Sequence, residues 1–413
     1  MTSRFSRQDA LELDEADALA PLRDRFDLPP GLIYLDGNSL GVLPRSTAPC
    51  LAEVIRTQWG RDLITSWNRH DWIGLPIRLG HKIAPLVGAH PDEVIVCDST
   101  SINLFKLITA GMAARPGRST ILTEEGGFPT DRYIVDAAAA LDGGHKVRAR
   151  PRGAIVGGID EDVAIVVLTH VDYRSGHQFD MASVSAAAHA NGALMLWDLS
   201  HSAGAVSVDL GRSGADLAVG CGYKYLNGGP GAPAWLFVAR QHHDSIASVL
   251  SGWMGHAQPF AFEECYRPAA GPARFLCGTP PILAMAALEQ GLVQFDGVDL
   301  DRLFAKGRAL GDLYIRLMEE RCSDHGFTLA SPRQNSQRGS HVSVAHEQAY
   351  PICRALIERG VVGDFRAPDL LRMGFTPLYT RFVDIWDAVA AIRVVMETRA
   401  WDDERMHLRE TVT

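Results

Sequence analysis

A series of short apolar runs, separated by stretches with helical spacing, limits what this chain can fold into. The clearest run covers residues 163–168, and similar runs cover residues 93–97 and 193–198. Near-continuous apolar strands that alternate with helices are typical of a parallel sheet covered on both faces. We therefore expect an α/β fold whose main layer is a mostly parallel sheet between helices.

Polar and aromatic residues whose side chains can bind ligands or take part in catalysis follow directly after these expected strands. In an open parallel sheet, ligands bind beyond the carboxyl ends of the strands, which lie along one rim. We therefore expect a ligand site along this rim. The residues that fall there are Thr100, Phe128, Thr169, Asp198, His201 and Lys224.

Lys224 lies in the stretch 215–231, where an apolar run that predicts a buried strand breaks into glycines. Lysine is rarely buried, and desolvation lowers its pKa, which makes it a good Schiff-base nucleophile. The glycines do not form a phosphate-binding P-loop, because the lysine precedes them. On local grounds alone, a surface lysine in a loop fits as well as a catalytic one.

Asp198, His201 and Lys224, together with hydroxyls at the start of the helix near Thr100 and Ser101, suit pyridoxal 5′-phosphate (PLP). This cofactor needs a lysine for its aldehyde, a carboxylate for its pyridine nitrogen and donors for its phosphate. Two alternatives remain at this point: Asp198 as a structural cap and His201 as a core histidine. A metal site is not expected, because Asp198 and His201 offer two ligands and spacing supplies no third.

Composition restricts the class of protein further. The 413 residues are 46% hydrophobic with a net charge of −9, so a large core is expected and a nucleic-acid partner is not. The apolar runs are too short to span a membrane, and the first 30 residues lack the apolar core of a signal peptide. Seven cysteines without a Cys-x-x-Cys pair predict reduced thiols and a cytoplasmic location.

The chain divides where its composition changes. A loop region rich in glycine, proline and aromatic residues covers 251–281, and one long helix is expected over 282–321. We expect residues 1–45 to join the small domain and residues 46–281 to form the large PLP-binding domain. Residues 282–413 should form a bridging helix and the C-terminal small α+β domain.

Several sequence blocks carry a resemblance to a known family. The most specific are Asn-Ser-Leu-Gly at 38–41, Tyr-Lys-Tyr-Leu-Asn at 223–227 and Gly-Trp at 252–253. Further blocks lie at 100–103, 128–131, 197–201, 280–281 and 371–379. Through these blocks, which span almost the whole chain, it resembles the kynureninases, PLP enzymes of fold type I in the class V aminotransferase group.

The resemblance implies roles for the cofactor residues. Lys224 would form the Schiff base and move the Cα proton, and Asp198, with His201 close by, would bind the pyridine nitrogen. Phe128 would stack on the cofactor ring. The other residues around the cofactor would be Thr100, Ser101, Pro129, Thr130, Asp131, Thr169 and Tyr223, with Trp253 and Thr279 reaching its phosphate from the second subunit of a homodimer.

The resemblance also implies the substrate and reaction. Arg372 would pair with the α-carboxylate of an amino-acid substrate, and Asn38 and Ser39 would line the substrate side. Without the resemblance, Arg372 also fits a surface arginine on a strand. The implied reaction is the hydrolytic cleavage of the Cβ–Cγ bond of L-kynurenine to anthranilate and L-alanine in tryptophan catabolism. Tyr223 is the candidate for proton transfer at Cβ, and 3-hydroxykynurenine is a candidate second substrate.

Two alternatives come from other classes of protein. A cysteine desulfurase or selenocysteine lyase needs a nucleophilic cysteine on a mobile loop, and neither Cys277 nor Cys322 lies in an obvious loop motif. A catalytically silent fold used for binding is the second alternative. The presence of Lys224, Asp198 and Arg372 argues against it.

Overall fold

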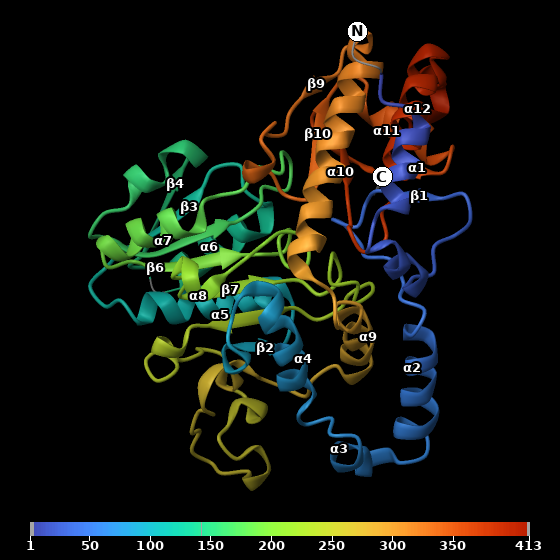
Figure 1. The fold of residues 1–413 in the computed structure, drawn as a ribbon. Helices are drawn as coiled ribbons and strands as arrows, with labels where there is room; N and C mark the ends of the chain where they lie inside the picture. Colours follow the sequence, from blue (N-terminus) through green and yellow to red (C-terminus); the bar gives the residue numbers. More distant parts are fainter. Residues whose placement is uncertain (1–3, 142, 411–413) are drawn as a thin grey trace. The chain divides into compact units, whose positions relative to one another are not determined.

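A computed structural model describes residues 4–141 and 143–410, and it divides into two compact units (Figure 1). The large unit consists of Thr47–His170 and Phe179–Val293. The small unit combines three separate segments: Met1–Ser46, Val171–Gln178 and Gln294–Thr413. Each unit has its own sheet and its own hydrophobic core.

The large unit is built around a seven-stranded sheet. Strand β8 is antiparallel to both of its neighbours, and all the other pairs are parallel. This confirms the mostly parallel sheet expected from the apolar runs. In spatial order the strands are β2 (Val94–Val96), β8 (Trp235–Val238), β7 (Leu217–Gly220), β6 (Leu194–Asp198), β5 (Val163–Thr169), β3 (Thr120–Glu124) and β4 (Lys146–Arg150).

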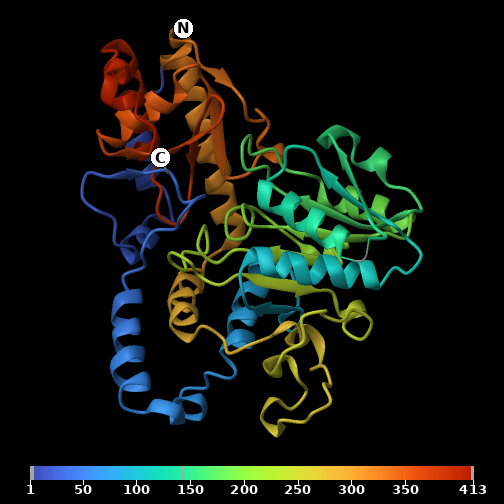
Figure 2. The same cartoon turned by 180° about the vertical axis from the view of Figure 1, so that it is seen from behind.

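Helices cover both faces of this sheet (Figures 1 and 2). Helix α5 (Thr100–Ala113) packs on one face, where its Gly111 lies against the side chains of Ile165 and Leu194, and α6 (Pro129–Ala140) lies beside it. Trp197 points to the opposite face, where its indole N–H donates to Ser185 Oγ of α7 (Met181–Ala190) at 3.4 Å. Helix α8 (Leu210–Ser213) packs beside α7 on that face.

The large unit also contains helices beyond those that cover the sheet. Helix α4 packs so closely on β2 that a Cβ at Gly80 would meet the Val94 carbonyl oxygen at 2.1 Å. A π-helical segment, Val54–Trp59, extends α2. The four helices are α2 (Thr47–Glu53), α3 (Ser66–Arg69), α4 (Leu75–Ile83) and α9 (Ile282–Val293).

The small unit combines a four-stranded antiparallel sheet with helices, and this confirms the expected α+β part. The sheet order is β12 (Asp364–Arg366), β13 (Leu370–Gly374), β10 (His341–Ala345) and β9 (Thr328–Leu329). A separate parallel pair joins β1 (Ile33–Tyr34) to β11 (Val361–Val362). The helices of this unit are α1 (Arg7–Glu15), α10 (Leu300–Arg321), α11 (Ala349–Ile357), α12 (Phe382–Glu397) and α13 (Glu404–His407).

The single helix expected over 282–321 is wrong, because the structure has two helices there, α9 and α10. Gly297 between them has φ +74°, a left-handed conformation that interrupts a helix. Asp299 then caps α10 by accepting a hydrogen bond from the Arg302 backbone N–H at 3.1 Å. The apolar spacing continues across the break, which is why periodicity alone joined the two helices.

Gly220 at the end of β7 gives a test of this packing. A Cβ at this position would lie 2.5 Å from the indole ring of Trp235, its partner across the β7–β8 pair. We expect Gly220→Ala to lower the free energy of unfolding by about 1–3 kcal/mol, because the buried indole has no room to move. Urea denaturation measures this, with Gly157→Ala as the control, since a Cβ there meets nothing within 4 Å. Equal stability of the two variants would show that the β7–β8 contact is not tight.

Candidate active site

Lys224 follows β7 in a turn and is half-buried. Its Nζ lies 3.0 Å from His201 Nε2 and 5.8 Å from the ring centroids of both Phe128 and Tyr223. The structure therefore brings together three of the residues expected along the rim of the sheet, Phe128, His201 and Lys224, with Tyr223 beside them.

Two buried carboxyls lie next to this group. Asp198 ends β6 and pairs in register with Thr169 at the end of β5, whose hydroxyl donates to Asp131 Oδ2 at 2.8 Å. The Ser200 backbone N–H donates to Asp198 Oδ1 at 2.7 Å. Burial and the Asp198 carboxylate raise the pKa of Asp131 well above its usual value. Burial also raises the pKa of Asp198, while Ser200 and the Lys224 cation oppose this effect.

A cavity of about 360 Å³ opens at the start of α5. Its lining includes Ser99, Thr100, Tyr223 and Thr279. Ser99 caps α5, and its hydroxyl oxygen accepts from the Ile102 backbone N–H at 3.4 Å. Hydroxyls beside the N–H groups at a helix start form a suitable anion site.

A buried lysine, Lys106, lies further along α5. The ammonium of Lys106, whose side chain is fully buried, donates to Asp98 Oδ2 and to the Phe275 carbonyl, both at 2.5 Å. Asp98 directly precedes Ser99 and has φ +47°, a conformation uncommon outside glycine. The ion pair therefore holds the turn that leads into α5. Sequence reasoning missed Lys106, since its helical spacing gives no sign of burial.

The residues of the large unit fit PLP. Lys224 provides the amine, Asp198 provides a buried carboxyl, and the start of α5 provides donors beside a cavity. The phenyl ring of Phe128 lies close enough to Lys224 to cover a flat cofactor bound there. Each chemical group that PLP needs from the protein therefore has a matching residue in this set.

The other residues expected around the cofactor lie at element ends or in a separate cluster. Ser101 lies in the first turn of α5, and Pro129 and Thr130 open α6. Trp253 is 37% exposed and stacks at 6.4 Å on Phe262. Phe260 meets the Trp253 ring edge-on at 5.4 Å, which completes an aromatic cluster at the surface.

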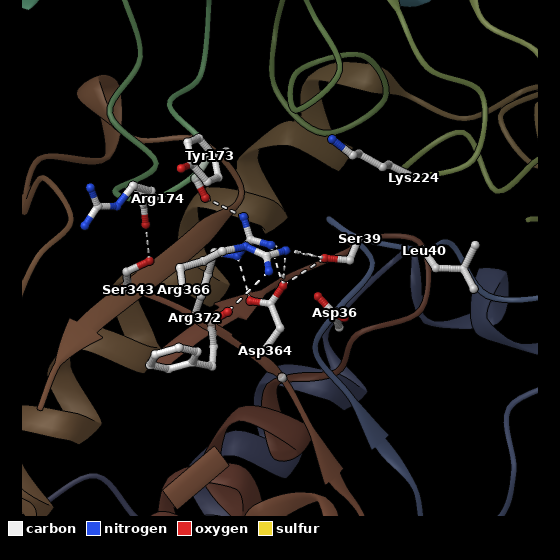
Figure 3. Close-up of polar contacts among 12 residues, drawn as sticks. Asp36, Ser39, Leu40, Tyr173, Arg174, Lys224, Ser343, Asp364, Arg366 and Arg372 are labelled. Atoms are coloured by element: carbon white, nitrogen blue, oxygen red, sulfur yellow. Dashed lines mark hydrogen bonds and ion pairs between the residues drawn. The ribbon is translucent and has the colours of Figure 1, made fainter. Parts of the chain in front are cut away.

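The residues expected on the substrate side come together in the small unit (Figure 3). Arg372 of β13 pairs in register with Asp364 of β12 on one side and with Ser343 of β10 on the other. Its Nε donates to Asp364 Oδ1 at 2.8 Å and its Nη2 donates to Oδ2 at 2.5 Å, while Nη1 donates to the Tyr173 carbonyl. The surface alternative for Arg372 is wrong, because the residue is 1% exposed.

Asn38 and Ser39 complete this cluster. The Ser39 hydroxyl donates to Asp364 Oδ2 at 2.9 Å and accepts from Arg372 Nη2 at 3.1 Å. With its amide group oriented so that the oxygen faces the guanidinium, Asn38 accepts from Arg372 Nε at 3.1 Å and Nη2 at 2.9 Å. All three residues predicted for the substrate side therefore share one hydrogen-bond network.

Sequence reasoning missed two acidic residues and one arginine in the same network. Asp364 and Arg366 lie two positions apart on β12, and Arg366 Nη2 lies 2.7 Å from Asp364 Oδ2. Asp36 is buried close to them and follows β1. The spacing of Asp364 and Arg366 was a weak signal for one face of a strand. Their link to Arg372 depends on strand register, which the sequence does not display.

Comparison with known proteins identifies the family. Residues 303–392 match the family model of the kynureninase C-terminal domain. The chain is 48% identical to a kynureninase of Burkholderia mallei over 414 residues, which cover 99% of this chain and all of that protein. The identity to a kynureninase of Pseudomonas fluorescens is 47% with the same coverage. The chain belongs to the kynureninase family.

Solved structures with the same fold include more distant PLP enzymes. A cysteine desulfurase from Thermococcus onnurineus has a TM-score of 0.76 at 16% identity, covering 92% of this chain and 98% of that one. A C-DES mutant with glycine covalently linked to its PLP cofactor has a TM-score of 0.78 at 17% identity, covering 90% and 98%. This likeness confirms PLP fold type I and, at such low identity, says nothing of the reaction. Family membership makes the chain a PLP-dependent enzyme of the hydrolase class.

Two further properties concern only residues 4–141 and 143–410. Among them, no helix combines the length and the apolar character needed to cross a bilayer. Within the same residues, no group of three histidine, cysteine or acidic side chains is arranged to hold a metal ion.

Proposed function

We propose that this chain hydrolyses the Cβ–Cγ bond of L-kynurenine to give anthranilate and L-alanine, a step of tryptophan catabolism, and that it also accepts 3-hydroxykynurenine. The observation that carries the proposal is the full-length match at 48% identity to a kynureninase. The contact of Lys224 with His201, next to the buried Asp198, supports it.

In this proposal, residues of the large unit bind the cofactor and move protons. PLP, when bound, stabilises negative charge at the substrate Cα. Lys224 would hold the cofactor through Nζ and move the Cα proton, while His201, 3.0 Å away, orients the lysine. Asp198 would accept the N–H of the pyridine ring, and a charge-assisted hydrogen bond of this kind contributes about 1.5–3 kcal/mol.

Other residues hold the cofactor in place. Phe128 covers its ring, and Thr169 orders the neighbouring carboxyl of Asp131. The hydroxyls of Thr100 and Ser101 bind the phosphate at the start of α5, where the helix dipole adds to their effect. Pro129 and Thr130 open α6 directly after Phe128, which is the N-cap residue of that helix.

The substrate α-carboxylate binds the guanidinium of Arg372, with Asn38 and Ser39 beside it. The planar fork of Nε and Nη2 donates two parallel hydrogen bonds to Asp364, and the guanidinium offers its positive charge to the substrate carboxylate. The buried contact with Asp364 keeps this fork in one orientation. Binding therefore needs little side-chain ordering, which favours affinity.

Tyr223 donates the proton at Cβ in this proposal. Burial raises the pKa of its phenol, so the hydroxyl stays protonated at neutral pH and acts as a donor. We expect Tyr223→Phe to lower kcat about 10²–10⁴-fold, the range for loss of one acid–base group. Anthranilate fluorescence measures the rate, and the absorbance of bound PLP shows that the cofactor remains. Unchanged kinetics would remove Tyr223 from the mechanism.

The proposed reaction is tested with purified protein, added PLP and L-kynurenine. We expect anthranilate fluorescence to rise only when protein, cofactor and substrate are all present. Parallel reactions contain 3-hydroxykynurenine or L-cysteine, the latter with a sulfide assay. Sulfide without anthranilate would replace the proposal with a desulfurase, and bound PLP without any product would favour a silent fold.

We further propose a homodimer in which Trp253 and Thr279 reach the phosphate of the second copy, and a cytoplasmic location. The exposed rings of Trp253, Phe260 and Phe262 support the dimer, because clustered apolar surface marks interfaces. Seven free cysteines support a reducing compartment. Light scattering of Phe262→Ser, beside the unaltered protein, tests whether this aromatic cluster holds the dimer together.

A further inference from the structure

Asp36 is a buried carboxyl of the small unit that the proposed reaction does not use. It is 9% exposed, and its Oδ1 accepts no hydrogen bond from any residue that the structure describes. Its backbone forms a bridge with Gly374 at the end of β13, two residues from Arg372. Asn38 and Ser39 follow it in the chain, so Asp36 lies at the base of the substrate-side cluster (Figure 3).

The second carboxyl of the cluster, Asp364, lies beside the first (Figure 3). Asp36 bridges Gly374 of β13, Asp364 pairs in register with Arg372 of the same strand, and Ser39, three residues after Asp36, donates to Asp364 Oδ2 at 2.9 Å. Asp364 already pairs with both Arg372 and Arg366. Two neighbouring buried carboxylates repel each other, and such a pair is relieved when one of them binds a proton. Asp364 is paired with both arginines and therefore stays ionised, so Asp36 is the carboxyl of the pair that binds the proton.

The proton changes the charge of the whole cluster. With both carboxyls ionised, Asp36 and Asp364 cancel the charges of Arg366 and Arg372. With Asp36 protonated, the cluster keeps one net positive charge. An anionic substrate group that enters a buried site needs this charge, because unpaired buried charge is costly.

We propose that Asp36 is a positioning residue that holds a proton against Asp364 and thereby leaves the Arg372 cluster one net positive charge for the substrate carboxylate. The inference rests on the proposed role of Arg372. The step is a simple protonation: Asp36 takes a proton from solvent, and its new O–H donates to an Asp364 oxygen. Substrate binding then requires the protonated form.

The charged groups around Asp36 support the proposal that it holds a proton. Burial, and then the Asp364 carboxylate, raises the pKa of Asp36 to about 7. Burial acts to raise the pKa of Asp364, but the charge and hydrogen bonds of Arg372 outweigh it and hold that pKa below its usual value. The other ionisable groups around Asp36 are Tyr34, Cys353 and Tyr379, and burial raises the pKa of each, so that they stay neutral while Asp36 titrates.

The inference predicts a pH effect on KM for L-kynurenine. The pKa of Asp36 is raised, so the proton is bound below about pH 7 and is lost as pH rises through that value. If binding requires the proton, KM should rise about tenfold for each pH unit above the pKa. Groups of the large unit that act in the chemical step affect kcat, which separates their titration from that of Asp36.

The experiment measures KM and kcat from about pH 6 to 9 for the wild type, Asp36→Asn and Asp387→Asn, all saturated with PLP. We expect KM to rise with pH in the wild type and in Asp387→Asn, a surface control whose ion pair with Arg7 lies outside the cluster. In Asp36→Asn the amide carries no titrating proton, so this rise should disappear. Titration of the substrate is common to all three proteins and cancels in the comparison.

Infrared spectroscopy gives a second readout that needs no turnover. We expect the difference spectrum between wild type and Asp36→Asn to contain a protonated carboxylic-acid carbonyl band below about pH 7 that fades above it; buried Asp131 and Asp198, whose pKa values are also raised, are common to both proteins and cancel. If the band is missing, or if Asp36→Asn keeps the pH-dependent KM, the proposal is overturned. If the band is present but Arg372→Gln leaves KM unchanged, the proposed role of Arg372 fails instead.

Discussion

Replacing Lys224 with alanine should lower kcat for L-kynurenine by at least about 10³-fold. The variant loses both the amine that holds the cofactor and the base for the Cα proton, and one acid–base group alone contributes 10²–10⁴-fold. Anthranilate fluorescence measures the loss. Lys146→Ala is the matched control, because Lys146 is exposed on the edge strand β4 and should keep full activity.

A spectrum separates loss of chemistry from loss of fold in this variant. The absorbance that reports the lysine–cofactor bond should be absent in Lys224→Ala, while circular dichroism should match the wild type. The half-buried side chain leaves only a small space when truncated, so we expect little change in stability. Substantial turnover by Lys224→Ala would rule out this lysine and require another amine.

Replacing Arg372 with glutamine should raise KM for L-kynurenine about 10²-fold and also destabilise the fold. The first effect follows from losing charge-assisted hydrogen bonds to the substrate carboxylate, which contribute about 1.5–3 kcal/mol. The second follows because Asp364 loses its bidentate partner, and breaking a buried ion pair costs about 3–5 kcal/mol. Initial rates and urea denaturation measure the two effects.

Two further variants separate these effects. Arg7→Gln removes a surface ion pair with Asp387 and should change the free energy of unfolding by less than about 1 kcal/mol. The double variant Arg372→Gln/Asp364→Asn removes the unpaired carboxylate, so it should recover part of the stability while KM stays high. Recovery of KM in the double variant would show that Arg372 acts only through the fold.

Much of the large unit was predictable from the sequence, because its signals are local. The apolar run that forms β5 is continuous, and it ends at Thr169, where the register with Asp198 follows from parallel pairing. Residues after such strands share one rim, so the approach of His201 to Lys224 was within reach of pattern alone. Strand β4 was missed because its alternating lysine and arginine residues, typical of a protected edge, hide its apolar side.

The substrate-side cluster was predictable only in part. The resemblance to the kynureninases pointed to Arg372, Asn38 and Ser39. Nothing local pairs Arg372 with Asp364, because their contact depends on the antiparallel register of β12 and β13. Asp36 is much further from Asp364 in the chain than Arg372 is, and its burial follows from the tertiary fold. The register between strands and the burial of individual residues depend on the tertiary fold, and a single sequence does not determine them.

The small unit is formed by three separate segments of the chain, and this affects its folding during protein synthesis. Strand β1 pairs with β11, and the Gly374 backbone N–H donates to the Leu35 carbonyl at 2.7 Å, so the segment that carries β1 needs partners that are synthesised long after it. At about 5–20 residues per second, β1 waits on the order of tens of seconds while the large unit is made. Its apolar side chains, Ile33 and Leu35, are available to chaperones during this time. If synthesis stops before β11, strand β1 has no partner strand to pair with.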